Sequence, residues 1–266
     1  MKKVYYILLL VTILCVACEF KLKPNIEDVQ NAQIEIKRYD RLESRYLTTG
    51  DFSALQQMNT EYPMETRTLL EKVLQLGEVN DPNISHKFLM FYQDSVLQTL
   101  LSDAETQYAN MDDLNQQFND TYEKLHEWLP TLKKPLVYAQ IGALDQSVIV
   151  GEESIGISLD KYMGGSYPLY KKYYTPVQTA SMNRSFIVPD AFCFYLLSAY
   201  RISNFESLPQ LKRDLHMGKI MWVVNQAVGR QVFTTPYTVI VDRYMKKHKN
   251  VTVGKLLESE DYSDFK

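Results

Sequence analysis

The spacing of apolar residues along the chain predicts helices on either side of a short run of strands. In the first half, apolar residues recur every three to four positions in four segments, as expected of helices with one buried face. The third of these carries a single stripe from Phe88 to Leu100. A short alternating run over 34–39 is instead typical of a half-buried strand. Each helical segment opens with a capping residue or a first-turn proline, near Asp51, Pro63, Ser85 and Asp112.

The middle of the chain has a different pattern, which predicts a small sheet. Three short runs rich in β-branched residues are separated by turn residues: 136–141, 147–150 and 155–159. Strands that follow one another in this way favour an antiparallel meander. Helical spacing returns in segments that start near Pro189 and Pro209, and again over 238–247. Residues 31–266 are therefore predicted to form a single α+β domain that is mostly helical, with a small antiparallel sheet in its middle.

The first residues carry the pattern of an export signal. Two lysines precede an uncharged apolar run from Val4 to Val16, and the small Ala17 stands directly before Cys18. A basic start, an apolar core and a small residue at the cut are typical of a secretory signal. The run is shorter than the roughly 20 apolar residues that span a bilayer. Residues 14–18 resemble the lipobox of bacterial lipoproteins, in which the cysteine becomes the lipidated first residue.

This resemblance predicts three parts of the chain: a signal peptide over 1–17, a lipidated N-terminus and tether over 18–30, and the domain over 31–266. Bacterial lipoproteins carry two or three acyl chains, palmitate among them, so a membrane anchor on Cys18 would be effectively permanent. The domain would then lie in the cell envelope. The tether lacks the acidic cluster expected for surface display, which favours a periplasm-facing protein. The alternative is an ordinary secretory signal followed by a chance cysteine.

Charge and cysteine content narrow the classes of partner. Removing Lys2 and Lys3 with the signal leaves 27 basic residues against 32 acidic ones, a net charge of −5. That balance argues against a nucleic-acid partner and against a polybasic membrane patch. With Cys18 acylated, Cys193 would be the one cysteine left in the mature chain, so no intramolecular disulfide is expected. Its aromatic neighbours predict a buried apolar residue.

Patterns that carry catalysis or metal binding are few. No Gly-x-Ser-x-Gly elbow and no Walker loop is present. Adjacent carboxylates at 112–113 and 152–153 are interpreted first as helix-capping and loop residues. The sequence therefore predicts no metal, no cofactor and no enzymatic activity. The four histidines form no His-x-x-x-His pair and stand at no other metal-ligand spacing: His86, His126, His216 and His248.

The most distinctive segment lies over 158–176, where five tyrosines surround two adjacent glycines and two prolines. One interpretation is a structured loop that packs its tyrosines on the domain. The other is a recognition surface, because tyrosine combines a large contact area with a polar tip. The candidate interaction residues are Asp160, Tyr162, Gly164, Tyr167 and Tyr170.

The same segment carries a family resemblance. The sequences ISLDKYMG at 157–164 and YPLY at 167–170 resemble the hallmark of the gliding motility-associated lipoprotein B (GldB) family of Bacteroidetes. Three further matches follow the same order, IKRYD at 36–40, VLQLG at 73–77 and IVPD at 187–190. The resemblance implies a membrane-tethered envelope protein, needed in gliding species for gliding and its associated secretion machinery. It implies no established enzymatic activity, and members in non-gliding bacteria mean that motility does not follow.

The family is also distantly similar to predicted zinc proteases of the zincin type, in which a small sheet precedes a helix with His-Glu-x-x-His. The corresponding helix would begin at Pro189, and residues 191–197 contain neither histidine nor glutamate. A zincin-like fold here would be a non-catalytic derivative that keeps a cleft, because it lacks zinc ligands and a general base.

Three hypotheses follow. The first is a structural or assembly lipoprotein that contacts envelope proteins through the sheet edge and the tyrosine-rich loop. The second is a module that binds peptide or glycan in a remnant cleft, with Tyr162, Tyr167 or Tyr170 gripping the ligand. The third is a hydrolase with an unrecognised site, for which Asp160 and Asp190 are the first carboxylates to test.

Overall fold

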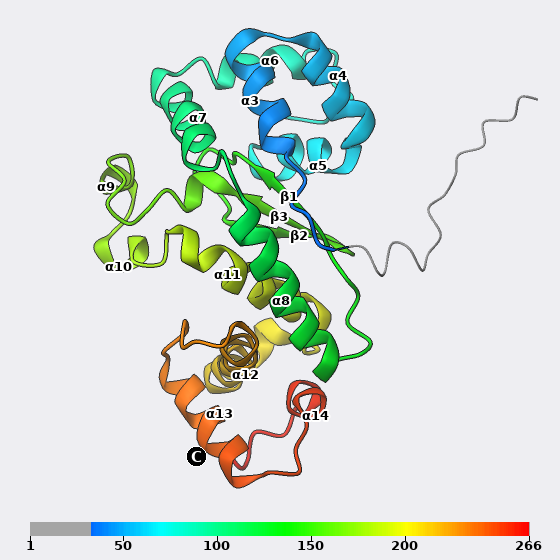
Figure 1. The fold of residues 1–266 in the computed structure, drawn as a ribbon, viewed down its shortest axis with the longest axis vertical. Coiled ribbons are helices and arrows are strands. Elements are labelled where there is room, and N and C mark those ends of the chain that lie inside the picture. The colour runs from blue at the N-terminus through cyan, green and yellow to red at the C-terminus, as the bar shows by residue number, and fades with distance from the viewer. Residues whose placement is uncertain (1–32, 266) are drawn as a thin grey trace, which may run out of the picture. The chain divides into compact units, whose positions relative to one another are not determined.

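The chain alternates from helices to a small sheet and back to helices (Figure 1). The computed structural model describes residues 33–265, so the predicted signal peptide, Cys18 and most of the tether lie outside the described residues. The prediction of a mostly helical α+β domain with a small sheet in its middle is confirmed. Ahead of the sheet lie α3 (Tyr39–Thr49), α4 (Phe52–Glu61), α5 (Pro63–Thr68), the π-helix η1 (Leu69–Val73), α6 (Ile84–Phe91), α7 (Ser95–Gln107) and α8 (Asp112–Trp128).

One predicted helix is two in the structure. The apolar stripe from Phe88 to Leu100 predicts one helix, but α6 ends at Phe91 and α7 begins at Ser95. Asp94 divides them, because its side chain accepts hydrogen bonds from the backbone N–H groups of Val96 and Leu97. An N-cap of this kind fixes a new helix start, and both helices still turn their apolar faces inward.

The sheet contains three strands, β1 (Leu136–Gln140), β2 (Val148–Val150) and β3 (Ser154–Ser158), in the order β1-β3-β2. The pair of β2 and β3 is antiparallel as expected, but β1 runs parallel to β3, so the expected antiparallel meander is wrong for this pair. β3 takes the central place because Gly156 leaves room for the ring of Tyr138 opposite it. A Cβ atom at Gly156 would lie 2.5 Å from that ring.

The alternating segment before α3 pairs with the sheet at one position. Lys37 forms a parallel bridge to Tyr138, while Ile34 and Ile36 are buried as their alternation predicts. Their backbone N–H groups bond instead to Asn119 and Asn115 of α8, at 2.7 and 2.9 Å. The segment is therefore an extended chain held between β1 and α8.

The second half of the chain is again helical, and it packs on the sheet and on α8. In α11, Phe192 packs on Phe118 of α8 with ring centroids 5.5 Å apart. Figure 1 shows α8 running from the level of the sheet toward the C-terminal helices. The elements after the sheet are η2 (Leu159–Lys161), α9 (Tyr170–Tyr173), α10 (Pro176–Thr179), η3 (Arg184–Phe186), α11 (Ile187–Ala199), η4 (Phe205–Ser207), α12 (Gln210–Val228), α13 (Pro236–Lys247) and α14 (Val253–Glu258).

Candidate binding groove and the buried polar network

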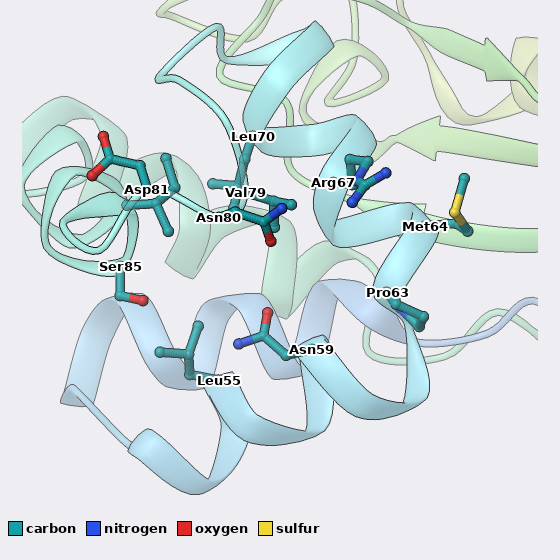
Figure 2. Close-up of a pocket in the computed structure, with 11 residues that line it drawn as sticks. Leu55, Asn59, Pro63, Met64, Arg67, Leu70, Val79, Asn80, Asp81 and Ser85 are labelled. Carbon is teal, nitrogen blue, oxygen red and sulfur yellow. The ribbon is translucent and has the colours of Figure 1, made fainter.

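A groove of about 510 Å³ opens between α4, α5, η1 and the loop that precedes α6 (Figure 2). Leu55, Leu70 and Ile84 are buried apolar residues of its lining. The remaining lining residues are polar or partly exposed: Asn59, Pro63, Met64, Arg67, Val79, Asn80, Asp81 and Ser85.

The groove arises from a break between two helices. Tyr62 ends α4, and Pro63 begins α5, where its missing N–H costs no hydrogen bond. Thr66 is buried in the corner and donates from its hydroxyl to the carbonyl oxygen of Met58 at 2.8 Å. The chain therefore changes direction at Pro63, which places α4 and α5 as two walls of the groove, as Figure 2 shows.

The opposite wall is held by the π-helix and the loop after it. The wider π-turn of η1 runs over residues 69–73, and Gln75 then adopts a left-handed conformation with φ of 52°. The carboxylate of Glu71 accepts a hydrogen bond from the backbone N–H of Val79 at 2.9 Å, which ties the loop to η1. π-turns are rare and occur frequently at functional sites.

The polar groups of the groove differ in how far they are already engaged. Asp81 is paired with Lys87 at 2.7 Å, and hydrogen bonds hold its pKa below the ordinary value. In contrast, the carboxamides of Asn59 and Asn80 make no hydrogen bond to any residue within 33–265, and they face the groove from different walls (Figure 2). The guanidinium of Arg67 lies 3.8 Å from the carboxylate of Glu71. The groove thus offers hydrogen-bonding groups and a cation beside an apolar floor.

A second cluster of polar groups lies at the carboxyl ends of β1 and β3, and its groups are hydrogen-bonded within the domain. Glu43 is fully buried and accepts a hydrogen bond from the backbone N–H of Ile141 at 2.8 Å. Tyr92 donates to the carbonyl oxygen of the same residue at 2.7 Å. Burial raises the pKa of Glu43 well above its usual range, and nearby Asp160 raises it further.

Asp160 anchors a strained loop. Its two carboxylate oxygens accept from the backbone N–H groups of Gly142 and Leu144, at 2.8 and 2.5 Å. Ala143 and Leu144 both have positive φ, 50° and 67°, an arrangement that non-glycine residues adopt only when their surroundings enforce it. The hydroxyl of Tyr174 adds a hydrogen bond to the carbonyl oxygen of Leu144 at 2.6 Å. With both oxygens engaged and no exposed surface, Asp160 stabilises this loop.

The predicted interaction residues gather around the turn η2, at different depths. Like Asp160, Tyr162 and Tyr170 are buried in the core, and the hydroxyl of Tyr170 donates to the carbonyl oxygen of Asp160 at 2.6 Å. Gly164 and Tyr167 are partly exposed, and Tyr167 donates to the carboxylate of Asp103 at 2.9 Å. Within this set, an approaching partner would meet Gly164 and Tyr167.

Asp190, the other candidate carboxylate, lies in the first turn of α11. It accepts a hydrogen bond from the hydroxyl of Tyr162 at 2.9 Å. Burial raises the pKa of Asp190 to about 6, and the bond from Tyr162 opposes that rise. Cys193, one turn further, is buried as predicted, and burial raises the pKa of its thiol to about 12. Among residues 33–265, no three histidine, cysteine or acidic side chains are placed to share a metal ion.

Sequence reasoning did not identify the groove. Asn59, Arg67 and Asn80 belong to separate segments, and none forms part of a recognisable motif. The available signal was the large apolar side chains that fall on the outer faces of their helices. Phe52 is 74% exposed and Met64 is 64% exposed. Exposed apolar residues near a groove are typical of a contact surface.

Comparison with models of known protein families gives a match. A family model described as "Gliding motility protein GldB" matches residues 19–232. Neither the curated proteins nor the solved structures that were compared with the chain give a match. Within residues 33–265, none of the helices combines the length and the apolar character needed to cross a membrane.

Proposed function

The chain belongs to the GldB family of gliding motility proteins, and from this premise we propose that it is an envelope lipoprotein, anchored through Cys18, with a structural or assembly role. The family match confirms the resemblance seen at 157–170 and in the shorter motifs. The family match is the observation that carries the proposal. The lipobox pattern points independently to the same kind of protein.

The position of the match supports the anchor. The family model begins to match at residue 19, directly after the cysteine that the lipobox assigns as the first residue of the mature protein. The tether would then hold the domain near the membrane, on the periplasmic side. Envelope proteins are the partners expected for such a domain.

The arrangement of the carboxylates supports a non-catalytic role. A hydrolytic carboxylate must reach a substrate or a water molecule. Asp160 is enclosed and bonded through both oxygens to the backbone. Asp190 accepts from Tyr162 through one oxygen and is half-buried. Residues 191–197 of α11 also provide no histidine or glutamate for a zincin-type site. The assembly role is therefore proposed ahead of a hydrolase.

The anchor is tested by replacing the cysteine in the full chain expressed in a Bacteroidetes host. Cys18→Ser should abolish incorporation of an alkyne-labelled palmitate analogue and move the protein from the membrane fraction to the soluble fraction. Cys15→Ser is the matched control, since Cys15 would leave with the signal peptide, and it should keep both the label and the membrane location. Label retained in Cys18→Ser would refute lipidation at that residue.

The assembly role is tested by purifying the tagged, lipidated protein from native membranes in mild detergent. A stoichiometric envelope protein identified by mass spectrometry is the expected result. Isolation of the protein alone, at native abundance and after crosslinking, would contradict the role.

A further inference from the structure

The groove between α4, α5, η1 and the loop over 78–85 has the chemistry of a peptide site. Its floor is apolar, with Leu55 and Leu70 buried beneath it. The carboxamides of Asn59 and Asn80 face the groove from separate elements, without partners in the described chain (Figure 2). A carboxamide presents one acceptor and two donors, and so it can bond the N–H and the C=O of a peptide backbone together.

The charge in the groove selects among peptides. Asp81 is neutralised by Lys87, and Glu71 accepts from the backbone N–H of Val79. The carboxylate contact of Arg67 within residues 33–265 is with Glu71 at 3.8 Å, which is longer than a hydrogen bond. The guanidinium can therefore donate hydrogen bonds to a second carboxylate in the fork geometry that arginine favours.

The surface around the groove extends the apolar area. Met64 lines the groove beside Arg67, as Figure 2 shows. Its side chain is largely exposed. A ligand in the groove would cover it.

We propose that this groove binds an extended peptide segment of a partner protein. An apolar side chain of the segment rests on Leu55, Leu70 and Ile84, its backbone bonds to Asn59 and Asn80, and an adjacent acidic residue pairs with Arg67. The volume of about 510 Å³ lies within the range of ligand sites in proteins. This inference rests on the proposed assembly role, and it specifies the kind of segment that the partner protein would present.

The test uses the full-length lipidated protein in detergent micelles and a phage-displayed library of random heptapeptides. We expect enrichment of sequences that place Leu, Ile, Val or Met within two positions of Asp or Glu. The enriched peptides are then synthesised with fluorescein, and their Kd is measured by fluorescence anisotropy.

Variants assign the binding to the groove. Asn59→Trp fills the groove and should weaken the enriched peptide at least tenfold. Gln56→Trp adds the same side chain on the same helix away from the lining, and should leave Kd within twofold. Arg67→Gln should weaken binding about tenfold, through loss of a charge-assisted hydrogen bond. Circular dichroism checks that each variant is folded.

Three results would overturn the proposal: no enrichment, binding that survives Asn59→Trp, or enriched peptides whose affinity does not respond to Arg67→Gln. A second copy of this chain as the occupant would also overturn it, and would be seen as a concentration-dependent dimer that Asn59→Trp abolishes. If the groove fails while an envelope protein still co-purifies from native membranes, the assembly role stands and the partner binds elsewhere.

Discussion

The carboxylate of Asp190 should make the stability of the domain depend on pH between about 4 and 6. The residue lies in the first turn of α11 and accepts a hydrogen bond from Tyr162 at 2.9 Å. Burial raises its pKa to about 6. Asp190→Asn removes the titration but keeps an oxygen that can accept from the Tyr162 hydroxyl, so the two proteins differ mainly in a charge.

The sign follows from the two pKa values. In the unfolded chain the pKa of an aspartate is about 3.9, and in the folded domain burial raises the pKa of Asp190 to about 6. Between those values the folded state keeps a proton that the unfolded state has released. The stabilising contribution is therefore fully present below about pH 4 and is lost as the pH rises to about 6. A difference of roughly two pKa units corresponds to at most about 3 kcal/mol.

The assay is urea denaturation of the wild type and of Asp190→Asn, followed by far-UV circular dichroism at half-unit steps from pH 4 to 8. The free energy of unfolding of the variant, minus that of the wild type, should rise by up to about 3 kcal/mol and then level off above pH 7. In Tyr162→Phe the midpoint of this pH dependence should lie at higher pH than in the wild type, because the Tyr162 hydroxyl lowers the pKa of Asp190. A difference that stays constant across the whole range would refute the reasoning.

Three further predictions concern the core. Burial lowers the pKa of Lys219 to about 8, whereas a lysine in the unfolded chain has a pKa of about 10.4. The buried charge therefore destabilises the folded domain below pH 8, and this cost is lost as the folded state releases its proton at higher pH. Urea denaturation should show the wild type gaining stability relative to Lys219→Met between pH 7 and 9.5. Glu43→Ala should cost about 2–4 kcal/mol in the same assay at pH 7, since it leaves a buried backbone N–H without its acceptor and opens a cavity. Gly156→Ala should cost about 1–3 kcal/mol in thermal unfolding, because the added Cβ would lie 2.5 Å from the ring of Tyr138. Gly254→Ala is the control and should not destabilise the domain, because the nearest neighbour of its Cβ would lie at 3.8 Å.

Local signals predicted the elements well, because they depend on neighbouring residues. Asp51 accepts from the N–H of Ser53 at the start of α4, and Pro63 begins α5, both where the sequence places them. The same reasoning missed the division at Asp94. There the apolar stripe continues through the break, and a continuous stripe cannot reveal that the backbone changes direction beneath it.

Strand pairing depended on contacts that no local pattern contains. The three strands lie where their β-branched runs predict, but the place of β3 beside β1 rests on the fit of Tyr138 over Gly156. These residues are distant in the chain, and a glycine within a strand run looks the same whether or not a ring covers it. Sequential turns therefore suggested a meander where the sheet is mixed.

The tyrosine-rich segment shows a similar limit. Composition identified the segment as distinctive, but it could not separate tyrosines that fill the core from those that face outward. Tyr162 and Tyr170 lie inside because their hydroxyls find buried acceptors, the carboxylate of Asp190 and the carbonyl oxygen of Asp160. Tyr167, with the acceptor Asp103 near the surface, stays partly exposed.

The polar groups at the strand ends and those of the groove differ in how many of their hydrogen bonds are made within the domain. At the sheet, carboxylates and strained backbone satisfy one another, and exposing Glu43 or Asp160 would break hydrogen bonds to the backbone at 141, 142 and 144. Such groups stabilise one shape of the loop at the strand ends. In the groove, the carboxamides of Asn59, on α4, and of Asn80, in the loop before α6, lack partners in the described chain, and the buried residues Leu55 and Ile84 hold these two elements against the core. Preformed polar groups over an apolar floor can bind another chain without rearrangement, which lowers the entropic cost of association. The carboxylates of Glu43 and Asp160 are thus committed to the fold, whereas the carboxamides of the groove remain available for binding.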